Sequence, residues 1–393
     1  MLKRDNYLFL LLFLLCFLPA NAQELLVDIG IVENSVMHYI RANHTFYVYS
    51  LDNDGNIKNL LMKKQKADRL LLRYSSQTND KLVIAAAPDL QTSSDDLLFM
   101  CNEKEIQSQC IWALKENLFE QKYQLYRGAL KVKVNQDSFT IINKLDIEDY
   151  LKGVVPSEMP TSWPLEALKA QAVAARTYTL AKLKRRENLG FDLKATVEDQ
   201  VYKGYAFENE RSNQALAETK SMALFDSLAK PIDAYFFSQA GAFSSSAQDV
   251  WGLEYSVYLR ANKIEDQMQA WKKTFSFYEL NMALDDLNLA DIVAVTVLNY
   301  TPERRVQELL LSSPTKHIKL QAEELRHKLA LRSTNFKVLI DGQRQKIDFI
   351  GYGFGHGIGM SQYGAKKLAQ EEKKSFKEIL QNFYSNASLK NFF

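Results

Sequence analysis

Residues 153–186 read GVVPSEMPTSWPLEALKAQAVAARTYTLAKLKRR, and this stretch decides the fold. From Trp163 onward it contains strong helix formers, with six alanines before Lys182 and Pro164 at the start, where a helix tolerates proline. Glu166 in the first turn and the basic residues at the end suit the helix dipole. Residues spaced by three or four define one face that a neighbouring element can approach closely: Leu165, Leu168, Ala172, Ala175 and Thr179. We therefore predict a buried scaffold helix.

Short strands surround this helix in the sequence. Residues 23–125 alternate short apolar runs with turn material such as DNDGN, which is typical of antiparallel strands and hairpins. Residues 126–146 predict two further strands, and the tail begins with Ser375 and Glu378 at capping-box spacing before a helical pattern. The sequence predicts an α+β fold, in which residues 126–393 form a mixed domain whose Ala-rich helix packs on short antiparallel strands. Residues 23–125 form a small, mostly β N-terminal region.

The first 22 residues have the three-part pattern of a secretory signal peptide. Lys3 and Arg4 precede the apolar run from Tyr7 to Leu18, and ANA at 20–22 supplies the small residues of a cleavage site. The run is short for a membrane span, which needs about 20 residues, although an uncleaved anchor is the alternative. We expect export to the periplasm or cell envelope, and membrane attachment only if this segment is retained.

The charge, cysteines and histidines of the exported chain give no reason to expect a nucleic-acid partner or a metal ion. Loss of the signal segment leaves a net charge near +1, which gives no argument for a nucleic-acid partner. Cys101 and Cys110 remain, and in an oxidising compartment they could close a small loop. The five histidines show no metal-ligand spacing, so neither a metal nor another cofactor is expected.

Glu158 is the leading candidate for chemistry. It lies in VVPSEMP, which we expect to form a turn held by Pro156 and Pro160. Val155 and Met159 give the carboxyl apolar neighbours, which raise a carboxyl pKa and favour a general acid. The alternative from the residues alone is a surface glutamate that caps the following helix.

A second unusual stretch, IGYGFGHGIGMSQYG at 350–364, places five of the 15 glycines at every second position. If it is extended, one face is bare backbone and His356 lies on the other with aromatic and aliphatic neighbours. Such a face indicates close approach by another backbone or by a ligand. His356 is therefore either a core residue or part of a cleft.

Four ordered motifs resemble the stage II sporulation protein D (SpoIID) family and its LytB-type relatives. They are LDIEDYLKGVVPSEMPTSWPLEALKAQAVAARTY, DQVYKGYAFENERSNQALAET, FFSQAGAFSSSAQDVWG and GYGFGHGIGMSQYGAKKLA. The resemblance covers roughly residues 125–393, so that region is expected to be the catalytic domain. Residues 23–120 resemble the family only loosely.

The resemblance implies a peptidoglycan lytic transglycosylase whose catalytic acid, and then base, is Glu158. It also implies that His356 belongs to the same cleft and that Tyr202 contacts substrate, although Tyr202 could equally be a strand aromatic. Ser238, Gly241 and Gln362 are further expected substrate contacts. Some family members have a cysteine beside the serine and may bind zinc; this chain has Gln239 and Ala240 there, which argues against that metal.

A single marked glutamate fits transglycosylation better than hydrolysis. Ordinary glycosidases use two carboxylates, whereas a lytic transglycosylase uses one group and the 6-hydroxyl of the sugar, and leaves 1,6-anhydro-muramic ends. The expected partner is the peptidoglycan glycan strand. The alternative is a non-catalytic LytB-type enhancer, which binds the wall and activates an N-acetylmuramoyl-L-alanine amidase. A purely structural wall protein is a third possibility.

Overall fold

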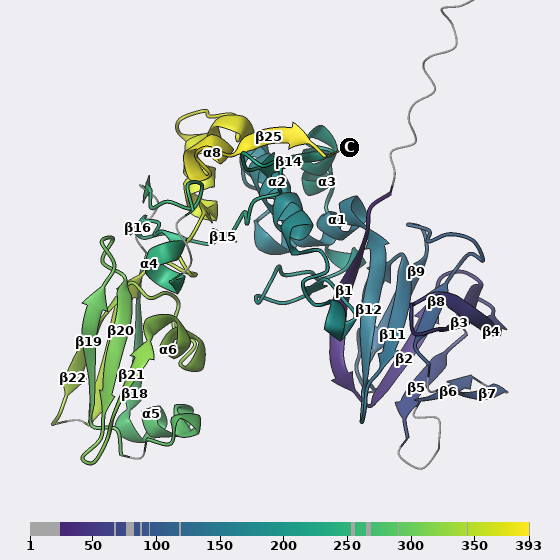
Figure 1. Ribbon diagram of the computed structural model, residues 1–393, viewed down its shortest axis with the longest axis horizontal. Helices are drawn as coiled ribbons and strands as arrows, with labels where there is room; N and C mark the ends of the chain where they lie inside the picture. Colours follow the sequence, from purple (N-terminus) through teal and green to yellow (C-terminus); the bar gives the residue numbers. More distant parts are fainter. Residues whose placement is uncertain are drawn as a thin grey trace, which may run out of the picture.

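The computed structural model combines three parts: a β-rich part, a group of helices and a smaller α/β lobe (Figure 1). The structure describes residues 24–66, 68–75, 82–86, 89–93, 95–117, 119–252, 256–264, 269–289, 291–343 and 345–392. The expected signal peptide at 1–22 lies outside the described residues. The mixture of helices and short sheets confirms the predicted α+β class.

The β-rich part consists of two mainly antiparallel sheets. The first has the order β13-β1-β12-β11-β8-β3-β4. Its strands are β1 (Leu26–Ser35), β3 (Phe46–Leu51), β4 (Ile57–Lys64), β8 (Leu97–Met100), β11 (Ala129–Val134), β12 (Phe139–Asp146) and β13 (Leu193–Lys194). The second has the order β10-β9-β2-β5-β6-β7. Its strands are β2 (Met37–Ala42), β5 (Leu70–Tyr74), β6 (Leu82–Ala86), β7 (Asp89–Ser93), β9 (Ile111–Lys115) and β10 (Gln124–Arg127).

The first sheet crosses the boundary expected between residues 125 and 126. Strand β12 pairs with β1 from Leu26↔Asp146 onward, and β11 pairs with β8. Strands that flank the site motif are therefore built into the same sheet as the N-terminal strands. As a result, helix α1 (Ile147–Glu158), which directly follows β12, starts from the end of a strand that is paired on both sides.

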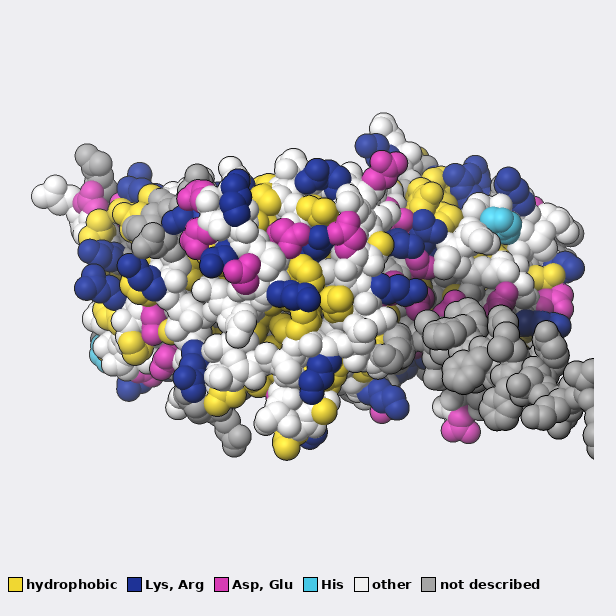
Figure 2. Space-filling model, turned by 90° about the horizontal axis from the view of Figure 1, so that it is seen from above, with side chains coloured by type: hydrophobic (Ala, Val, Ile, Leu, Met, Phe, Trp, Pro, Cys, Tyr) yellow, Lys and Arg dark blue, Asp and Glu magenta, His cyan; other side chains and the backbone are white. Residues whose placement is uncertain are grey.

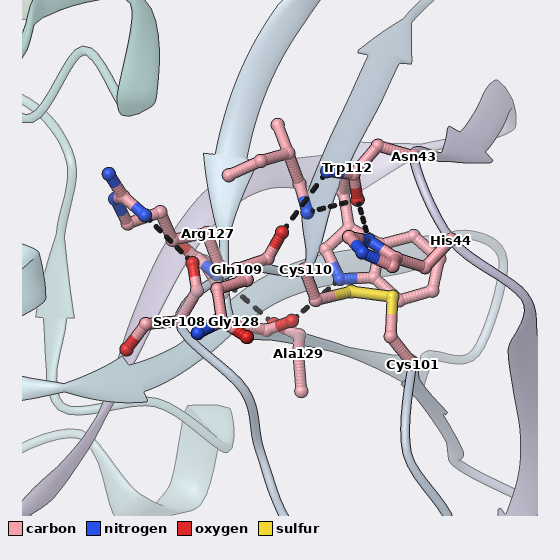
Figure 3. Close-up of a disulfide and its surroundings, with 12 residues drawn as sticks. Asn43, His44, Cys101, Ser108, Gln109, Cys110, Trp112, Arg127, Gly128 and Ala129 are labelled. Carbon is pink, nitrogen blue, oxygen red and sulfur yellow. Dashed lines mark hydrogen bonds between the residues drawn. A yellow bond between two sulfur atoms is a disulfide. The ribbon is translucent and has the colours of Figure 1, made fainter.

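A disulfide between Cys101 and Cys110 closes one corner of this part (Figure 3). Beside it, the Gly128 N–H donates to the Cys110 carbonyl at 3.0 Å, and the Trp112 indole N–H donates to the Gly128 carbonyl at 2.8 Å. The Trp112 ring packs edge-on against Phe46, with 5.3 Å between centroids. The small loop that the sequence allowed is therefore formed, and the bridge ties the end of β8 to the start of β9.

Helix α2 (Leu165–Lys182) is the predicted scaffold helix. It begins after Pro164 and ends at Lys182, four residues before Arg186, the last residue of the basic run. It contacts α1, β14 and three other helices. Those helices are α3 (Glu210–Glu218), α7 (Gln362–Gln370) and α8 (Phe376–Phe383). Five of its six alanines are fully buried, its main neighbours are helices, and β14 (Met222–Phe225) is its main strand contact. The capping box expected at Ser375 and Glu378 is confirmed at the start of α8.

Two strand pairs connect the C-terminal segment to this helical group. Strand β25 (Ser388–Asn391) pairs with β14, which brings the C-terminus beside α3 (Figure 1). Strand β24 (Met360–Ser361) pairs in parallel with β15 (Phe236–Phe237). This second pair joins the glycine-rich stretch to the serine-containing segment, two motifs that are far apart in the sequence.

Residues 270–352 form the lobe with its own hydrophobic core. It contains two three-stranded antiparallel sheets, β18-β23-β22 and β19-β20-β21, and two helices. The elements are β18 (Ala270–Ser276), α5 (Phe277–Ala283), β19 (Ala294–Tyr300), β20 (Val306–Ser312), β21 (His317–Gln321), α6 (Ala322–Lys328), β22 (Phe336–Asp341) and β23 (Lys346–Tyr352). The lobe also contains the 3₁₀ turn Asp285–Leu287. Shorter elements in the rest of the chain are α4 (Ala247–Trp251), β16 (Ala242–Phe243), β17 (Lys263–Ile264) and the 3₁₀ turns Glu187–Leu189 and Tyr205–Phe207.

Candidate active site

Glu158 is the last residue of helix α1, and not part of a turn as the flanking prolines suggested. The helix starts because the Asp146 side chain caps it, accepting from the Glu148 N–H at 2.8 Å. It continues through Pro156 and ends at Met159, whose backbone is extended ahead of Pro160. A helix C-terminus carries partial negative charge. The position itself therefore disfavours the ionised form of the Glu158 carboxyl.

Burial raises the pKa of Glu158 from 4.5 to about 7. The backbone N–H of Val201 donates to its Oε1 at 2.6 Å, and the Gln362 side chain also hydrogen-bonds the carboxyl; both contacts lower the pKa, as does the charge of Lys203. Among the residues that the structure describes, Lys203 is the only charged group acting on this pKa. The side chain is partly exposed, so Glu158 can be a neutral acid near pH 7 that still contacts solvent.

The segment that carries Val201 is held against α1 by close packing. A Cβ on Gly153 would lie 2.5 Å from the Tyr202 ring, so only glycine lets the ring lie against the helix. The Tyr202 hydroxyl donates to Asn143 Oδ1 at 2.9 Å, and the residue is only 4% exposed. Tyr202 therefore lies beneath the site, inside the core, and supports the Glu158 hydrogen bond from below. The Tyr202 ring is buried and does not lie at the surface, where the expected contact with substrate would form.

Pairing of β15 with β24 brings the segment that contains Ser238 beside Gln362, whose side chain contacts Glu158. The Tyr363 N–H donates to the Ser238 carbonyl at 3.1 Å, which seats the first turn of α7 on the end of β15. The Gln362 amide then reaches both Glu158 and the buried Gln171 of α2, to whose Oε1 it donates at 3.4 Å. Three of the four motifs thus meet at one carboxyl group.

The glycine-rich stretch is not one extended strand. Strand β23 ends at Tyr352, and the glycines at 353, 355, 357 and 359 all have left-handed backbones, with φ between 78° and 108°. A Cβ on Gly357 would overlap the buried Arg305 guanidinium, and one on Gly359 would overlap the Tyr235 carbonyl. The close approach that the sequence indicated is therefore made by the protein itself at these two positions.

His356 fastens this stretch to β15. The Ile358 N–H donates to its Nδ1 at 3.1 Å, which leaves the proton on Nε2 to donate to the Phe236 carbonyl at 2.9 Å. Burial lowers its pKa to about 4, so the ring is neutral at pH 7. Both ring nitrogens are hydrogen-bonded to backbone groups, so His356 holds the glycine-rich stretch in position and does not act as a general acid.

His356 also lines a pocket of about 470 Å³ between the helical group and α6 of the lobe. Its walls include Tyr178 and Trp251, whose ring centroid is 5.1 Å from that of His356, but not Glu158. The segment 197–201 links this pocket, through Val197 and Asp199, to the Glu158 carboxyl, through the Val201 N–H. Glu158 and His356 do not line the same pocket.

Gly241 lies three residues beyond Ser238 and has a left-handed φ of 70°. A Cβ there would lie 3.1 Å from Tyr352 Cβ and from the Gly353 nitrogen. It lines a different hollow, between residues 241–263 and the lobe. Gly241 thus lines a hollow that Glu158 does not line, whereas Gln362 contacts the Glu158 carboxyl and Ser238 contacts Tyr363, the neighbour of Gln362.

Two features of the site escaped the sequence analysis. Trp163 and Tyr363 pack edge-on with 4.8 Å between ring centroids, and the Lys366 ammonium lies 5.1 Å from the Trp163 ring. Trp163 and Tyr363 both lie within the quoted motifs, and this position was the available signal in the sequence. Gln171 was also missed, because in the sequence it is one polar residue within an alanine-rich helix.

The described residues contain no group of three or more His, Cys, Asp or Glu side chains that could hold a metal ion. In the same residues no helix has the length and apolar character needed to cross a membrane. Figure 2 shows Lys and Arg side chains interspersed with Asp and Glu over the face it presents, without one large basic patch.

Comparison with known proteins gives two matching family models and several relatives. The model described as Stage II sporulation protein matches residues 135–225, and one described as a domain of unknown function, DUF8618, matches residues 246–359. An uncharacterised protein of Brachyspira hyodysenteriae is 34% identical over 275 residues, which cover 67% of this chain and 72% of that protein.

Two relatives from Bacillus carry informative names. Stage II sporulation protein D of Bacillus amyloliquefaciens is 31% identical over 285 residues, or 67% of this chain and 80% of that protein. The amidase enhancer of Bacillus subtilis is 30% identical over 295 residues, or 62% of this chain and only 40% of the enhancer. The chain belongs to the stage II sporulation protein D family, as its motifs predicted. The Stage II sporulation protein model covers Glu158 and its Val201 partner, whereas the DUF8618 model contains the whole lobe.

Proposed function

We propose that this chain is an exported lytic transglycosylase that cleaves peptidoglycan glycan strands, with Glu158 as acid and then base. The observation that carries the proposal is the state of the Glu158 carboxyl. It is partly exposed and has a pKa of about 7. Within the described residues, no other carboxylate is among the groups that act on this pKa. Export rests on the signal pattern at 1–22, and no cofactor is invoked.

The proposed reaction uses one carboxyl group twice, first to donate a proton and then to accept another. Neutral Glu158 donates its proton to the glycosidic oxygen as the bond from that oxygen to C1 of the muramic residue breaks. The resulting carboxylate then accepts the proton of the 6-hydroxyl of the same sugar, whose oxygen bonds to C1 and closes the 1,6-anhydro ring. The Val201 N–H and the Gln362 amide stabilise the carboxylate between the two steps. No water is consumed, and Glu158 ends protonated.

The test is product analysis after incubation with purified glycan strands that lack stem peptides. We expect 1,6-anhydro-muramic ends by mass spectrometry, and a loss of at least about 100-fold in their rate of formation in Glu158→Gln. Glu372→Gln, a change at an exposed glutamate, is the matched control. Absence of anhydro ends with the wild-type chain, or their persistence in Glu158→Gln, contradicts the proposal.

The similarity to the amidase enhancer of Bacillus subtilis supports a second candidate function. In that case the chain binds the cell wall and stimulates a separate N-acetylmuramoyl-L-alanine amidase. Stimulation of a purified amidase on sacculi that is equal for the wild type and for Glu158→Gln would favour this function over the lytic one. This function ranks second because it leaves the carboxyl of Glu158 without a chemical role.

A further inference from the structure

A hollow of about 1150 Å³ lies between the lobe and residues 241–263, away from Glu158. One wall is β16 with the segment 261–263, and another is the tip of the β19–β20 hairpin at residues 300–304. Its floor comes from β22 and β23, including Phe336 and Ile350. The volume is at the upper end of the range for small-ligand sites, so the hollow can hold a molecule larger than one sugar ring.

Three exposed aromatic side chains from three different elements line this hollow. Phe243 of β16 is 42% exposed, Tyr300 of β19 is 52% exposed and Tyr352 of β23 is 38% exposed. Single exposed aromatic residues are common on protein surfaces, but several around one hollow mark a binding site. None of the three belongs to the core of the lobe, so packing of that core does not explain them.

The polar groups of the hollow narrow down the ligand. Asn335 adds a side-chain amide. Three exposed cations, Lys263, Arg304 and Lys337, also line the hollow, together with the Glu303 carboxylate. A pyranose ring has apolar C–H faces, which pack on aromatic rings, and a rim of hydroxyl and acetamido groups, which pair with amides. The cations suit carboxylates carried by the same polymer.

The wall that carries Phe243 is held in place by unusual backbone. Gly241 and Ala242 both have left-handed φ values, of 70° and 101°, and Gly241 packs on the backbone of β23. An alanine in this region is strained, and such strain is concentrated at functional sites. Because Gly241 follows Ser238 by three residues, its Cα lies within about 11 Å of the Ser238 Cα. The Ser238 carbonyl accepts from the Tyr363 N–H, next to Gln362, so the chain links the wall of the hollow to the segment that contacts Glu158.

We propose that the hollow lined by Phe243, Tyr300 and Tyr352 is a second saccharide site, which holds a carboxylate-bearing glycan strand while another part of the polymer lies at Glu158. The inference rests on the proposed function for the identity of the polymer. Two linked sites on one polymer raise the overall affinity well above that of either alone. The lobe therefore acts as the part of the protein that grips the wall.

The test is cosedimentation with insoluble peptidoglycan sacculi, performed in a Glu158→Gln background so that the polymer stays intact. Phe243→Ala combined with Tyr300→Ala should weaken binding at least about tenfold, because each removes an exposed ring. Tyr278→Ala is the matched control, since this tyrosine of α5 is 75% exposed on the same lobe but does not line the hollow. Binding by the double variant that equals that of Tyr278→Ala would overturn the proposal.

A second arm tests the assignment of the cations. Lys337→Gln should weaken binding of sacculi severalfold and leave binding of an uncharged N-acetylglucosamine tetramer unchanged, since only the sacculi carry carboxylates. Unchanged binding of both ligands would refute a carboxylate role for Lys337. Circular dichroism melting curves show whether each variant is folded, and all the altered side chains are exposed.

The two proposals fail in different ways. If the double variant loses binding but the wild type makes no anhydro ends, the hollow is supported and only the chemistry at Glu158 is refuted. If anhydro ends form but the double variant binds sacculi normally, only the hollow is refuted.

Discussion

The raised pKa of Glu158 predicts that Glu158→Gln stabilises the folded protein above pH 7. In the wild type the folded state holds this proton more tightly than the unfolded state does, with a pKa of about 7 against 4.5. Its contribution to the free energy of unfolding is therefore complete below pH 4.5 and is lost as the pH rises through 7. Glutamine has no proton to lose, so the variant is spared this loss.

The size of the effect follows from the shift. At about 1.4 kcal/mol per pH unit, the change from 4.5 to about 7 corresponds to about 3 kcal/mol as an upper limit. The side chain is partly exposed, and solvent reduces the figure. A neutral amide also replaces some of the contacts of the carboxyl. We therefore expect Glu158→Gln to be about 2 kcal/mol more stable, relative to wild type, at pH 8 than at pH 4.5.

Other groups change the stability of both proteins with pH. The lowered pKa of His356, about 4, gives a contribution that is complete above pH 6.5 and is lost as the pH falls toward 4. This slope is opposite to that of Glu158, so the wild-type curve alone mixes the two. The lowered pKa of Glu323, about 2, adds a loss only below pH 4.5. The difference between variant and wild type cancels both and isolates Glu158.

Urea unfolding of both proteins at pH 4.5 and pH 8, followed by tryptophan fluorescence, measures this difference. The transition midpoints and slopes give the free energies if each transition is single. Glu372→Gln controls for the loss of a negative charge at an exposed site. A Glu158→Gln effect of the same size at both pH values would refute the raised pKa and the neutral acid derived from it.

Three further changes test the framework of the site. Gly357→Ala places a Cβ on the Arg305 guanidinium at a left-handed φ of 85°, so it should lower the free energy of unfolding by about 2–4 kcal/mol. In the control Gly342→Ala, nothing lies within 4 Å of the new Cβ, and the loss should be under about 1 kcal/mol. Equal melting temperatures for the two variants would contradict the packing. Gln362→Ala removes a contact that lowers the Glu158 pKa, so the alkaline limb of the rate–pH curve should move to higher pH, and a shift downward would contradict the hydrogen bond. Joint replacement of Cys101 and Cys110 by serine should reduce stability by roughly 2–3 kcal/mol in calorimetry, and an unchanged melting temperature would show that the bridge does not matter.

Local patterns in the sequence were enough to predict the scaffold helix, the α8 capping box and the fold class. Each depends on residues that lie close together in the chain, such as the alanines of α2 or the pair Ser375 and Glu378. The choice of Glu158 also came from local features, since its apolar neighbours raise its pKa in the way the sequence suggested.

The partners of Glu158 could not be predicted in the same way. Val201 and Gln362 reach it from positions 43 and more than 200 residues away, and only the pairing of β15 with β24 and the packing of Tyr202 on Gly153 bring them there. The same limit explains the glycine-rich stretch. Its even spacing suggested a strand, but the left-handed conformations at Gly357 and Gly359 are imposed by Arg305 and Tyr235 from other segments.

One measurement tests the central claim most directly: digestion of glycan strands in water enriched in oxygen-18, followed by mass spectrometry of the new ends. If the sugar's own 6-hydroxyl attacks while Glu158 carries the proton, the products contain no heavy oxygen and are lighter than hydrolysis products by one water. New reducing ends that each carry one heavy oxygen atom would show that water is the nucleophile, and the single-carboxyl account would be wrong.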